Sequence, residues 1–258
     1  MTDANADDGS GRGLDERLIE RCEEIPATLP PGNYVVIDTL HFSNTVIELL
    51  ANGATHVHIT DERGEEFAYR ESNPRAKIGG SPTESYEPTD GYDFFNSPSY
   101  VQRLDLDGRP ASMTSSNGGR AVAKLRAVGR ENVTVYVGST MNAAALAAHL
   151  RTQEGDVHLV SSGSRGTVAV EDHIGATLIS RELDGLPLSE TERELFRKQL
   201  KTAKGADYVE KHEVRRRDVL DYAMNINSSR IVPKLVGESL VDIARTGGGA
   251  ATEGQTAD

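Results

Sequence analysis

The sequence predicts an α/β protein with a mostly parallel sheet, helices on both faces and a helical C-terminal region. Two observations carry this prediction. Short β-branched runs alternate with helical runs along most of the chain, and the strand-like runs are continuously apolar instead of apolar at every second position. Strands of that kind are buried on both sides, as they are in parallel sheets covered by helices.

Each strand-like run is followed by a helical one. The strands are expected at 34–38, 56–60, 111–115, 133–138 and 157–162. The helices that follow them are expected at 46–53, 65–71, 120–128, 143–150 and 171–183. Gly53 can end the first of these helices in a left-handed conformation.

Local signals mark two further helix starts. Ser97 followed by Pro98 is an N-cap with proline at the first helical position, and Ser189 with Glu192 matches a capping box. Residues 189–245 lose the strand signal and are expected to form charged amphipathic helices, as a helical cap or a dimer surface. The positions expected to be buried there are Leu195, Leu200, Val209, Val219, Leu220 and Ile226.

Length and end composition suggest one α/β domain over 14–245, flanked by flexible polar tails at 1–13 and 246–258. The sequence has no apolar run long enough to span a membrane and no secretory signal, so a cytoplasmic location is expected. Cys22 is the only cysteine. It excludes an internal disulfide and a multi-cysteine metal site, and it is expected to be a small buried residue on an N-terminal helix.

The charge balance excludes some partners. A net charge of -12 argues against nucleic acid or an anionic membrane bound through a broad basic face, while small anions and a homo-oligomer stay open. The chain has 7 Lys and 21 Arg against 40 acidic residues. Because salt screens surface charge, we interpret this balance as adaptation to high intracellular salt.

Four expected strands end in small, hydroxyl, amide or glycine residues just before a helix. In an open parallel sheet these carboxyl ends bind ligands, and the helix N-termini favour an anionic small molecule. Each such residue can also be an ordinary N-cap or turn former. The candidate substrate-binding residues are Ser43, Asn44, Asn96, Ser97, Ser116, Gly118, Asn142, Ser162 and Gly163.

Carboxylates at the same ends indicate a metal. Asp38 follows the first strand, and Glu171 and Asp172 start the long helix, so together they could hold Mg²⁺ beside a bound phosphate. Taken singly, Asp38 could be a structural acid, and the other two could simply favour the helix dipole. His41 and Asn117 complete the catalytic candidates with Asp38, although either could be only hydrogen-bonded or capping.

Other candidate anion-binding residues and other phosphate-transfer mechanisms have weaker support in the sequence. Arg120 and Arg165 could pair with an anion, but a surface position is the commoner fate of arginine. Cys22 has no arginine at the sixth following position, and Asp38 lacks the second aspartate of a DxD motif. The sequence has no GxxxxGK[ST] or GxGxxG loop, so phosphocysteine and nucleotide-kinase mechanisms lose their motifs.

Six segments, in this order, resemble the 2-phosphosulfolactate phosphatase family over roughly residues 33–240. They are YVVIDTLHFSNTVIELLANGA, GYDFFNSPSYV, TSSNGGRAV, VGSTMNAAALA, VSSGSRGTVAVEDHIGATLI and RRDVLDYAMNINSSRIVPKL. Asp38 matches the aspartate of the family's first motif, and Glu171–Asp172 match its later acidic pair. His41 stands where the family has arginine, and Gly80 stands where a glutamate is expected.

The resemblance implies Mg²⁺-dependent hydrolysis of 2-phospho-3-sulfolactate to 3-sulfolactate and phosphate, a step toward coenzyme M. The substrate would be a small phosphorylated acid. Two alternatives stay open. One is a non-catalytic relative that binds a small anionic metabolite at the same strand ends, and the other is a partner-binding protein that uses its C-terminal helices.

Overall fold

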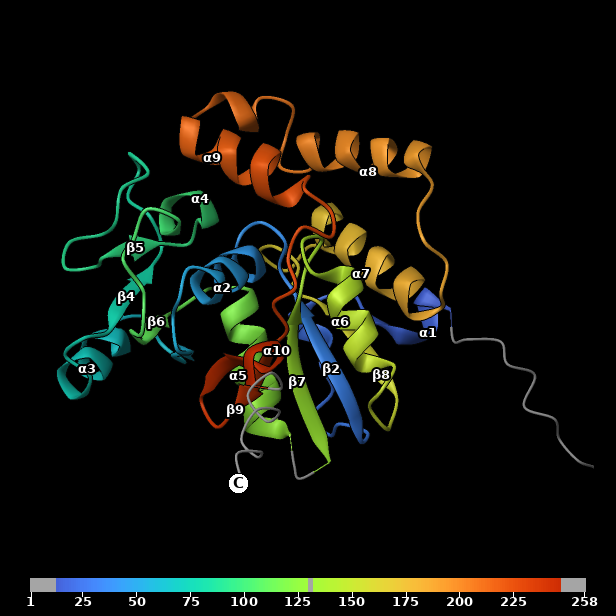
Figure 1. The fold of residues 1–258 in the computed structure, drawn as a ribbon, viewed down its shortest axis with the longest axis horizontal. Coiled ribbons are helices and arrows are strands. Elements are labelled where there is room, and N and C mark those ends of the chain that lie inside the picture. The colour runs from blue at the N-terminus through green and yellow to red at the C-terminus, as the bar shows by residue number, and fades with distance from the viewer. Residues whose placement is uncertain (1–12, 130–131, 247–258) are drawn as a thin grey trace, which may run out of the picture.

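The protein, described here as a computed structural model over residues 13–129 and 132–246, is built around one large sheet. Within these residues ten strands follow the order β1-β8-β2-β7-β9-β10-β3-β6-β4-β5 (Figure 1). The strands are β1 (Leu18–Ile19), β2 (Gly32–Ile37), β3 (Val57–Ile59), β4 (Lys77–Gly80), β5 (Phe94–Phe95), β6 (Ala111–Met113), β7 (Val133–Gly138), β8 (Val157–Ser161), β9 (Pro233–Val236) and β10 (Ser239–Asp242). All five expected strands are present, and the mostly parallel α/β fold is confirmed.

The sheet contains two parallel blocks. We call β1, β8, β2 and β7 the first block, and β3, β6, β4 and β5 the second block; neighbours within each block are parallel. The hairpin of β9 and β10 joins them, because β9 pairs antiparallel with β7 and β10 pairs antiparallel with β3. This hairpin corrects the prediction of helices throughout 189–245.

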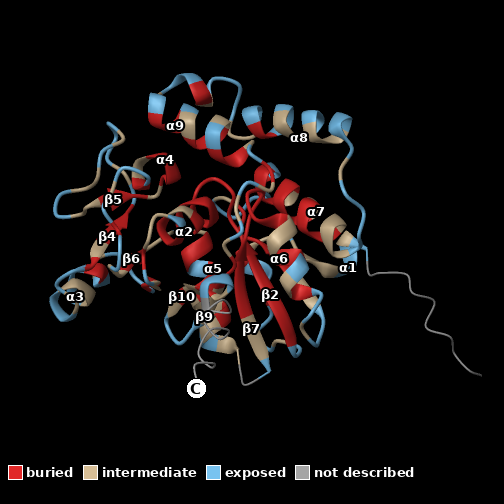
Figure 2. Cartoon of the chain, viewed as in Figure 1, coloured by how far each residue is buried: buried red, intermediate tan, exposed pale blue. Residues whose placement is uncertain are grey.

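Helices cover both faces of the first block, as continuous burial of its strands predicts. Alternate residues of β2 point to opposite sides: Tyr34 and Val36 pack with one core cluster, and Val35 and Ile37 with the other. The first cluster includes residues of α2 (Phe42–Ala51) and α5 (Gly118–Val128), and the second includes residues of α6 (Ala143–Leu150) and α7 (Val170–Leu183). Figure 2 shows the resulting concentration of buried residues along β2 and the adjoining part of β7.

The helices match the expected positions, and their start signals are confirmed. They are α1 (Leu14–Arg17), η1 (Cys22–Glu24), α2 (Phe42–Ala51), α3 (Glu65–Ser72), α4 (Pro98–Val101), α5 (Gly118–Val128), α6 (Ala143–Leu150), α7 (Val170–Leu183), α8 (Glu190–Thr202), η2 (Tyr208–Glu210), α9 (Glu213–Arg217), η3 (Asp218–Ala223) and α10 (Ile243–Thr246). Ser97 caps α4, Ser189 and Glu192 form a capping box on α8, and Gly53 follows α2 with φ of 102°. Cys22 is buried, in a 3-10 turn.

The C-terminal helices α8 and α9 lie across the carboxyl ends of β2 and β7 (Figure 1). The short helix α4, which follows β5 of the second block, contacts both α9 and the π-helix η3. Of the positions expected to be buried here, Leu195 is 55% exposed and that prediction is wrong, because it lies on the outer face of α8. Leu220 is half-buried, and the others are buried: Leu200, Val209, Val219 and Ile226.

Two expectations concern the ends of the chain. The predicted tails at 1–13 and 246–258 lie almost entirely outside the described residues, so the domain boundaries stay a prediction. Among the helices of the described ranges, none is long and apolar enough to cross a membrane.

Candidate active site

Asp38 stands directly after β2, at the carboxyl end of the first block, and is buried. Its Oδ2 accepts a 2.9 Å hydrogen bond from the backbone N–H of Gly118, the first residue of α5. Only glycine allows this approach, since a Cβ at 118 would lie 2.3 Å from the Phe42 ring and 2.9 Å from the Asp38 Cβ. The positive end of the α5 dipole therefore faces Asp38.

This contact also joins the two blocks. Three antiparallel junctions separate β7 from β3, so the strand direction reverses from one block to the other. The carboxyl end of β6, which leads into Gly118, nevertheless meets the carboxyl end of β2 at Asp38.

Asp172, in the first turn of α7, connects two backbone segments at the same rim. Its Oδ1 accepts a 2.9 Å hydrogen bond from the backbone N–H of Thr39, and its Oδ2 accepts a 3.1 Å bond from that of Gly163. The buried carboxylate thus ties the end of β2 to the loop after β8. Asp38, the Asn117 loop and the 161–172 segment lie at one rim, as predicted.

Glu171 is buried beside these aspartates and forms an ion pair with Lys204, just beyond α8. Burial opposes the charge of Lys204, but Glu171 and the two aspartates raise the pKa of its ammonium group above the ordinary value. The ammonium is therefore a permanent charge at the rim. Three buried acids share this one cation.

The shortage of positive charge at the rim is reflected in the pKa values of the buried aspartates. Burial raises the pKa of Asp38, against the lowering effects of the Gly118 N–H and Lys204. Burial, then Asp38 and Glu171, raise the pKa of Asp172 well above its ordinary value. In the described ranges, no group of three or more acidic, histidine or cysteine side chains is placed to hold a metal ion.

A pocket of about 170 Å³ opens where the strand ends meet. Its lining residues follow β2, β4, β5 and β6 or belong to α9: Asp38, Leu40, His41, Gly80, Ser81, Pro82, Asn96, Thr114, Ser115, Ser116, Asn117 and Arg215. A larger hollow of about 400 Å³ near the amino ends of β2 and β7 has no charged side chain among its described lining residues. A third hollow of about 590 Å³, lined by Asp61, Glu65, Arg126 and Glu238 among others, carries charges but none of the predicted site residues. The pocket at Asp38 is therefore the candidate site, because it holds the predicted residues at the strand ends.

The pocket gathers five of the predicted site residues. These are Asp38, His41, Asn96, Ser116 and Asn117. Gly118 acts beside it through its backbone N–H. The predicted Arg120 pairs with Glu23 on the surface, and Arg165 is exposed.

The other predicted substrate-binding residues do not line the pocket. The Ser43 hydroxyl accepts a bond from Asp38 N–H, and Asn142 bonds Ser139 N–H, Val137 O and Ile231 O. Asn44 is buried in α2, while Gly163 and the buried Ser162 lie in the loop after β8. Their contact with substrate stays a prediction.

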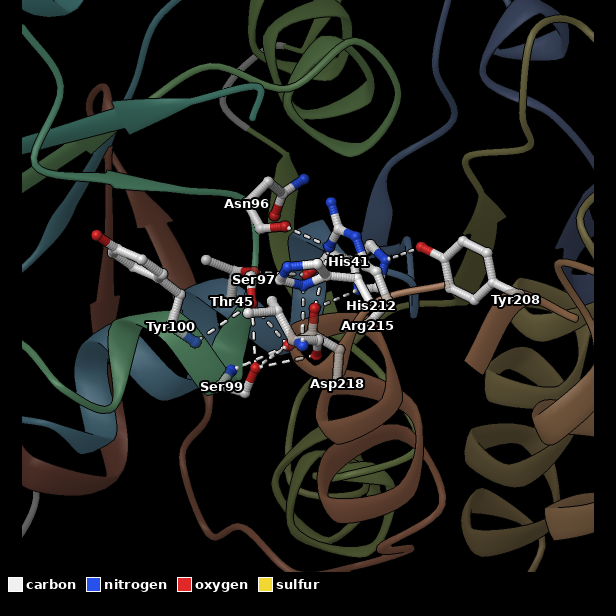
Figure 3. A network of polar contacts seen from close by, with 11 residues as sticks. His41, Thr45, Asn96, Ser97, Ser99, Tyr100, Tyr208, His212, Arg215 and Asp218 are labelled. Atoms are coloured by element: carbon white, nitrogen blue, oxygen red, sulfur yellow. Dashed lines mark hydrogen bonds and ion pairs between the residues drawn. The ribbon is translucent and has the colours of Figure 1, made fainter. Parts of the chain in front are cut away.

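A second set of polar side chains comes from the C-terminal helices (Figure 3). The Tyr208 hydroxyl lies 2.7 Å from His41 Nε2, and His41 Nδ1 lies 3.5 Å from Asp218 Oδ2. Burial, with the charges of Arg215 and Lys204, lowers the pKa of His41 well below its ordinary value. Burial raises the pKa of Tyr208 to about 12. Tyr208 is therefore protonated and His41 neutral at pH 7, and the two side chains share one hydrogen bond.

Asp218 is the centre of this set. Its Oδ1 accepts hydrogen bonds from the Ser97 hydroxyl at 2.7 Å and from the Ser99 hydroxyl at 2.6 Å, and its Oδ2 accepts one from Arg215 Nη1 at 3.0 Å. Ser97, a predicted substrate-binding residue, thus links α4 to the π-helix η3. The carboxylate holds the second block and the C-terminal helices together.

Arg215 and Lys204 were not among the predicted site residues. Both occur in charged helical stretches, where side chains are usually solvated. A signal was available for Arg215, because Val214, Asp218 and Val219 share its helix face and are all buried. A buried arginine on such a face indicates a polar partner in the interior.

Fold and site together define an α/β protein with a small polar pocket at the carboxyl ends of its strands, bordered by buried acids and one buried arginine. The model of the 2-phosphosulpholactate phosphatase family matches residues 19–238. The chain therefore belongs to this family of phosphatases, which are phosphoric monoester hydrolases.

Individual relatives carry the name of the same family. A probable 2-phosphosulfolactate phosphatase of Deinococcus radiodurans is 28% identical over 233 residues, covering 84% of this chain and 92% of that protein. One of Symbiobacterium thermophilum is 32% identical over 173 residues, covering 64% and 72%. One of Gloeobacter violaceus is 28% identical over 164 residues, covering 62% and 68%.

Proposed function

We propose that the protein is a Mg²⁺-dependent phosphomonoester hydrolase that converts 2-phospho-3-sulfolactate and water to 3-sulfolactate and phosphate. The observation that carries this proposal is the pocket at Asp38, where the N-terminus of α5 and the Asn117 loop meet a buried carboxylate in a chain of this family. The partner is a small phosphorylated acid, and the enzyme acts in the cytoplasm.

The carboxylates suit a magnesium ion. Mg²⁺ usually takes one or two carboxylates together with waters and substrate phosphate oxygens. Asp38 lines the pocket while its Oδ2 accepts Gly118 N–H, and Glu171 is its buried neighbour. Three buried acids opposed by one ammonium group favour a further cation. Bound there, Mg²⁺ would neutralise phosphoryl charge and orient water.

Asp172 has a different part in the proposal. Both of its oxygens accept backbone N–H groups, so it positions the loops of the rim and is a weaker ligand candidate than Asp38 or Glu171. The predicted three-carboxylate set stays a prediction, of which we retain Asp38 and Glu171.

The remaining groups bind the phosphate and leave the reaction to water. The N-terminus of α5 and the amide of Asn117 face the phosphate in the pocket. The oxygen of water bonds to phosphorus as the bond from phosphorus to the ester oxygen breaks, and the protons of water end on phosphate and on the sulfolactate hydroxyl. Neutral His41 lines the pocket as a hydrogen-bonding group. Cys22 does not line the pocket, so no phosphocysteine is needed.

The test is phosphate release from a panel of small phosphorylated acids at high salt, with Mg²⁺ or with EDTA. We expect 2-phospho-3-sulfolactate to be the best substrate and EDTA to abolish turnover, with activity returning on adding Mg²⁺. Full activity in EDTA would overturn the metal dependence, and release from unrelated phosphates at equal rates would overturn the substrate assignment.

One observation favours a second candidate, a non-catalytic binder of a small anion. Lys204 already neutralises part of the carboxylate charge without a metal. A protein of this kind would bind 3-sulfolactate in calorimetry with or without Mg²⁺ and would release no phosphate from any member of the panel.

A further inference from the structure

Arg215 is an unusual residue for a charged helix, because it is only 5% exposed and lines the pocket. Its Nη1 donates to the backbone carbonyl of Asn96 at 3.2 Å and to Asp218 Oδ2 at 3.0 Å. Its Nε is also buried and has no hydrogen-bond partner within the described part of the chain. A buried donor without a partner costs stability unless a ligand or water accepts its hydrogen bond.

The surroundings keep the guanidinium in place. Its central carbon lies 5.1 Å from the centre of the Tyr86 ring and 5.5 Å from that of Phe95. Arginine stacks on aromatic faces while its N–H fork stays able to bind an anion. Figure 3 shows Arg215 among Asn96, His41 and Asp218.

Asp218 does not fully neutralise Arg215. The carboxylate also accepts hydrogen bonds from Ser97 and Ser99, so its charge is shared with donors of α4. The neutral state of His41 leaves Arg215 as the permanent cation among the described pocket-lining side chains. A second anionic group on the ligand would find its strongest partner here.

The pocket therefore has two unlike sides. Asp38, with the α5 N-terminus, belongs to the side where the proposed reaction takes place. Arg215 enters from α9, and its charge acts on His41 and Tyr208. A cavity of about 170 Å³ holds a molecule with a short carbon chain, so a single ligand can reach both sides.

We propose that Arg215 is the specificity-determining residue that binds the acidic group of the substrate carbon chain, a sulfonate or a carboxylate, while the phosphate lies at Asp38. This inference rests on the proposed function. It gives the C-terminal helices a part in choosing the substrate: they contribute the cation that distinguishes a phosphorylated acid from a simple phosphate ester.

The test compares kcat/KM of wild type and Arg215→Gln on three substrates. These are 2-phospho-3-sulfolactate, 2-phospholactate without the sulfonate, and the phosphate ester of 1-sulfopropan-2-ol without the carboxylate. For the full substrate we expect a loss of about 100-fold, as for a buried charge left unpaired. The truncated substrate that lacks the group bound by Arg215 should change less than about threefold, because it has nothing to lose. That substrate identifies the group.

Two variants separate recognition from folding. Arg215→Lys keeps the charge and should recover part of the discrimination, and Arg216→Gln, on the exposed side of α9, should behave as wild type on all substrates. If Arg215→Gln lowers kcat/KM equally for all three substrates, or if Arg215→Lys folds normally and loses nothing, the proposal is overturned.

Failure of the proposed function would look different. Wild type would then release no phosphate from any of the three substrates, and calorimetry with 3-sulfolactate would replace the assay. Binding by wild type that is lost in Arg215→Gln, weakened in Arg215→Lys and kept in Arg216→Gln supports Arg215 as the anion-binding residue. Binding that is equal in all variants overturns it.

Discussion

The two sides of the pocket are built in opposite ways. The side at Asp38 carries acids, and the bonds that hold Asp38 and Asp172 in place come from the backbone N–H groups of Gly118, Thr39 and Gly163. The C-terminal residues 204–218 carry the cations: Lys204 pairs with Glu171 at the rim, and Arg215 lines the opposite side of the pocket and pairs with Asp218. The sheet thus contributes the acidic rim, and the C-terminal helices contribute the positive charge that balances it. Neither side is complete alone.

The largest effect should come from the acidic side. Asp38→Asn should lower turnover by about 100-fold or more, equivalent to roughly 3 kcal/mol in the barrier. The amide oxygen can still accept the Gly118 bond, so the variant should fold, as thermal unfolding would verify. Cys22→Ser is the control and should keep its turnover. A fully active Asp38→Asn enzyme would remove Asp38 from the mechanism.

On the side of the pocket that carries Arg215, the largest effect should be on the free energy of unfolding. Asp218→Ala removes the acceptor of Ser97, Ser99 and Arg215 and leaves a buried guanidinium uncompensated. The free energy of unfolding should fall by about 3 kcal/mol, measured by denaturant titration. The exposed Asp221→Ala, on the same π-helix, should change it by less than about 0.5 kcal/mol. Equal losses in the two variants would mean that the Asp218 network does not hold the helices.

Lys204 tests whether the two sides compensate each other. Lys204→Met leaves three buried acids without their cation, so stability in EDTA should fall by about 2 kcal/mol, less than for a fully buried pair. Millimolar Mg²⁺ should restore part of the loss, since an ion bound only to the folded state stabilises it. The exposed Lys201→Met, on α8, should show neither effect. Loss without recovery in Mg²⁺ would argue against a cation site at these acids.

A smaller, pH-dependent effect is expected at Glu48 of α2, away from the charges of either side. Burial raises the pKa of Glu48 to about 7. Its stabilising contribution is then fully present below the ordinary glutamate pKa and is lost as pH rises through about 7. Because Glu48 is half-buried, we expect stability to fall by only about 1–2 kcal/mol between pH 5 and 8.

Glu48→Gln should flatten this dependence, whereas Glu71→Gln, an exposed change at the end of α3, should keep it. Thermal unfolding across the pH range is the measurement. An unchanged slope in Glu48→Gln would assign the pH dependence to other groups, including those at the rim.

The acidic side of the pocket at Asp38 is far more predictable from the sequence than the side that carries Arg215. Strands such as β2 are continuously apolar, and Asp38 is the first polar residue after one, so local sequence predicts both. The position of Arg215 depends on how α9 packs on α4, which no local pattern contains. The hairpin of β9 and β10 was missed because its strands are short, begin at Pro233 and follow a long charged helical stretch. Its place in the sheet is set by edges of β7 and β3 that are far away in the chain.

That hairpin also orders events during biosynthesis. The chain leaves the first block after β2, builds the whole second block, and returns for β7 and β8. If the two blocks form before residues 233–242 emerge from the ribosome, β7 and β3 would each be an unpaired sheet edge, and such edges attract foreign strands. The last strands of the sheet to be translated thus join its two halves.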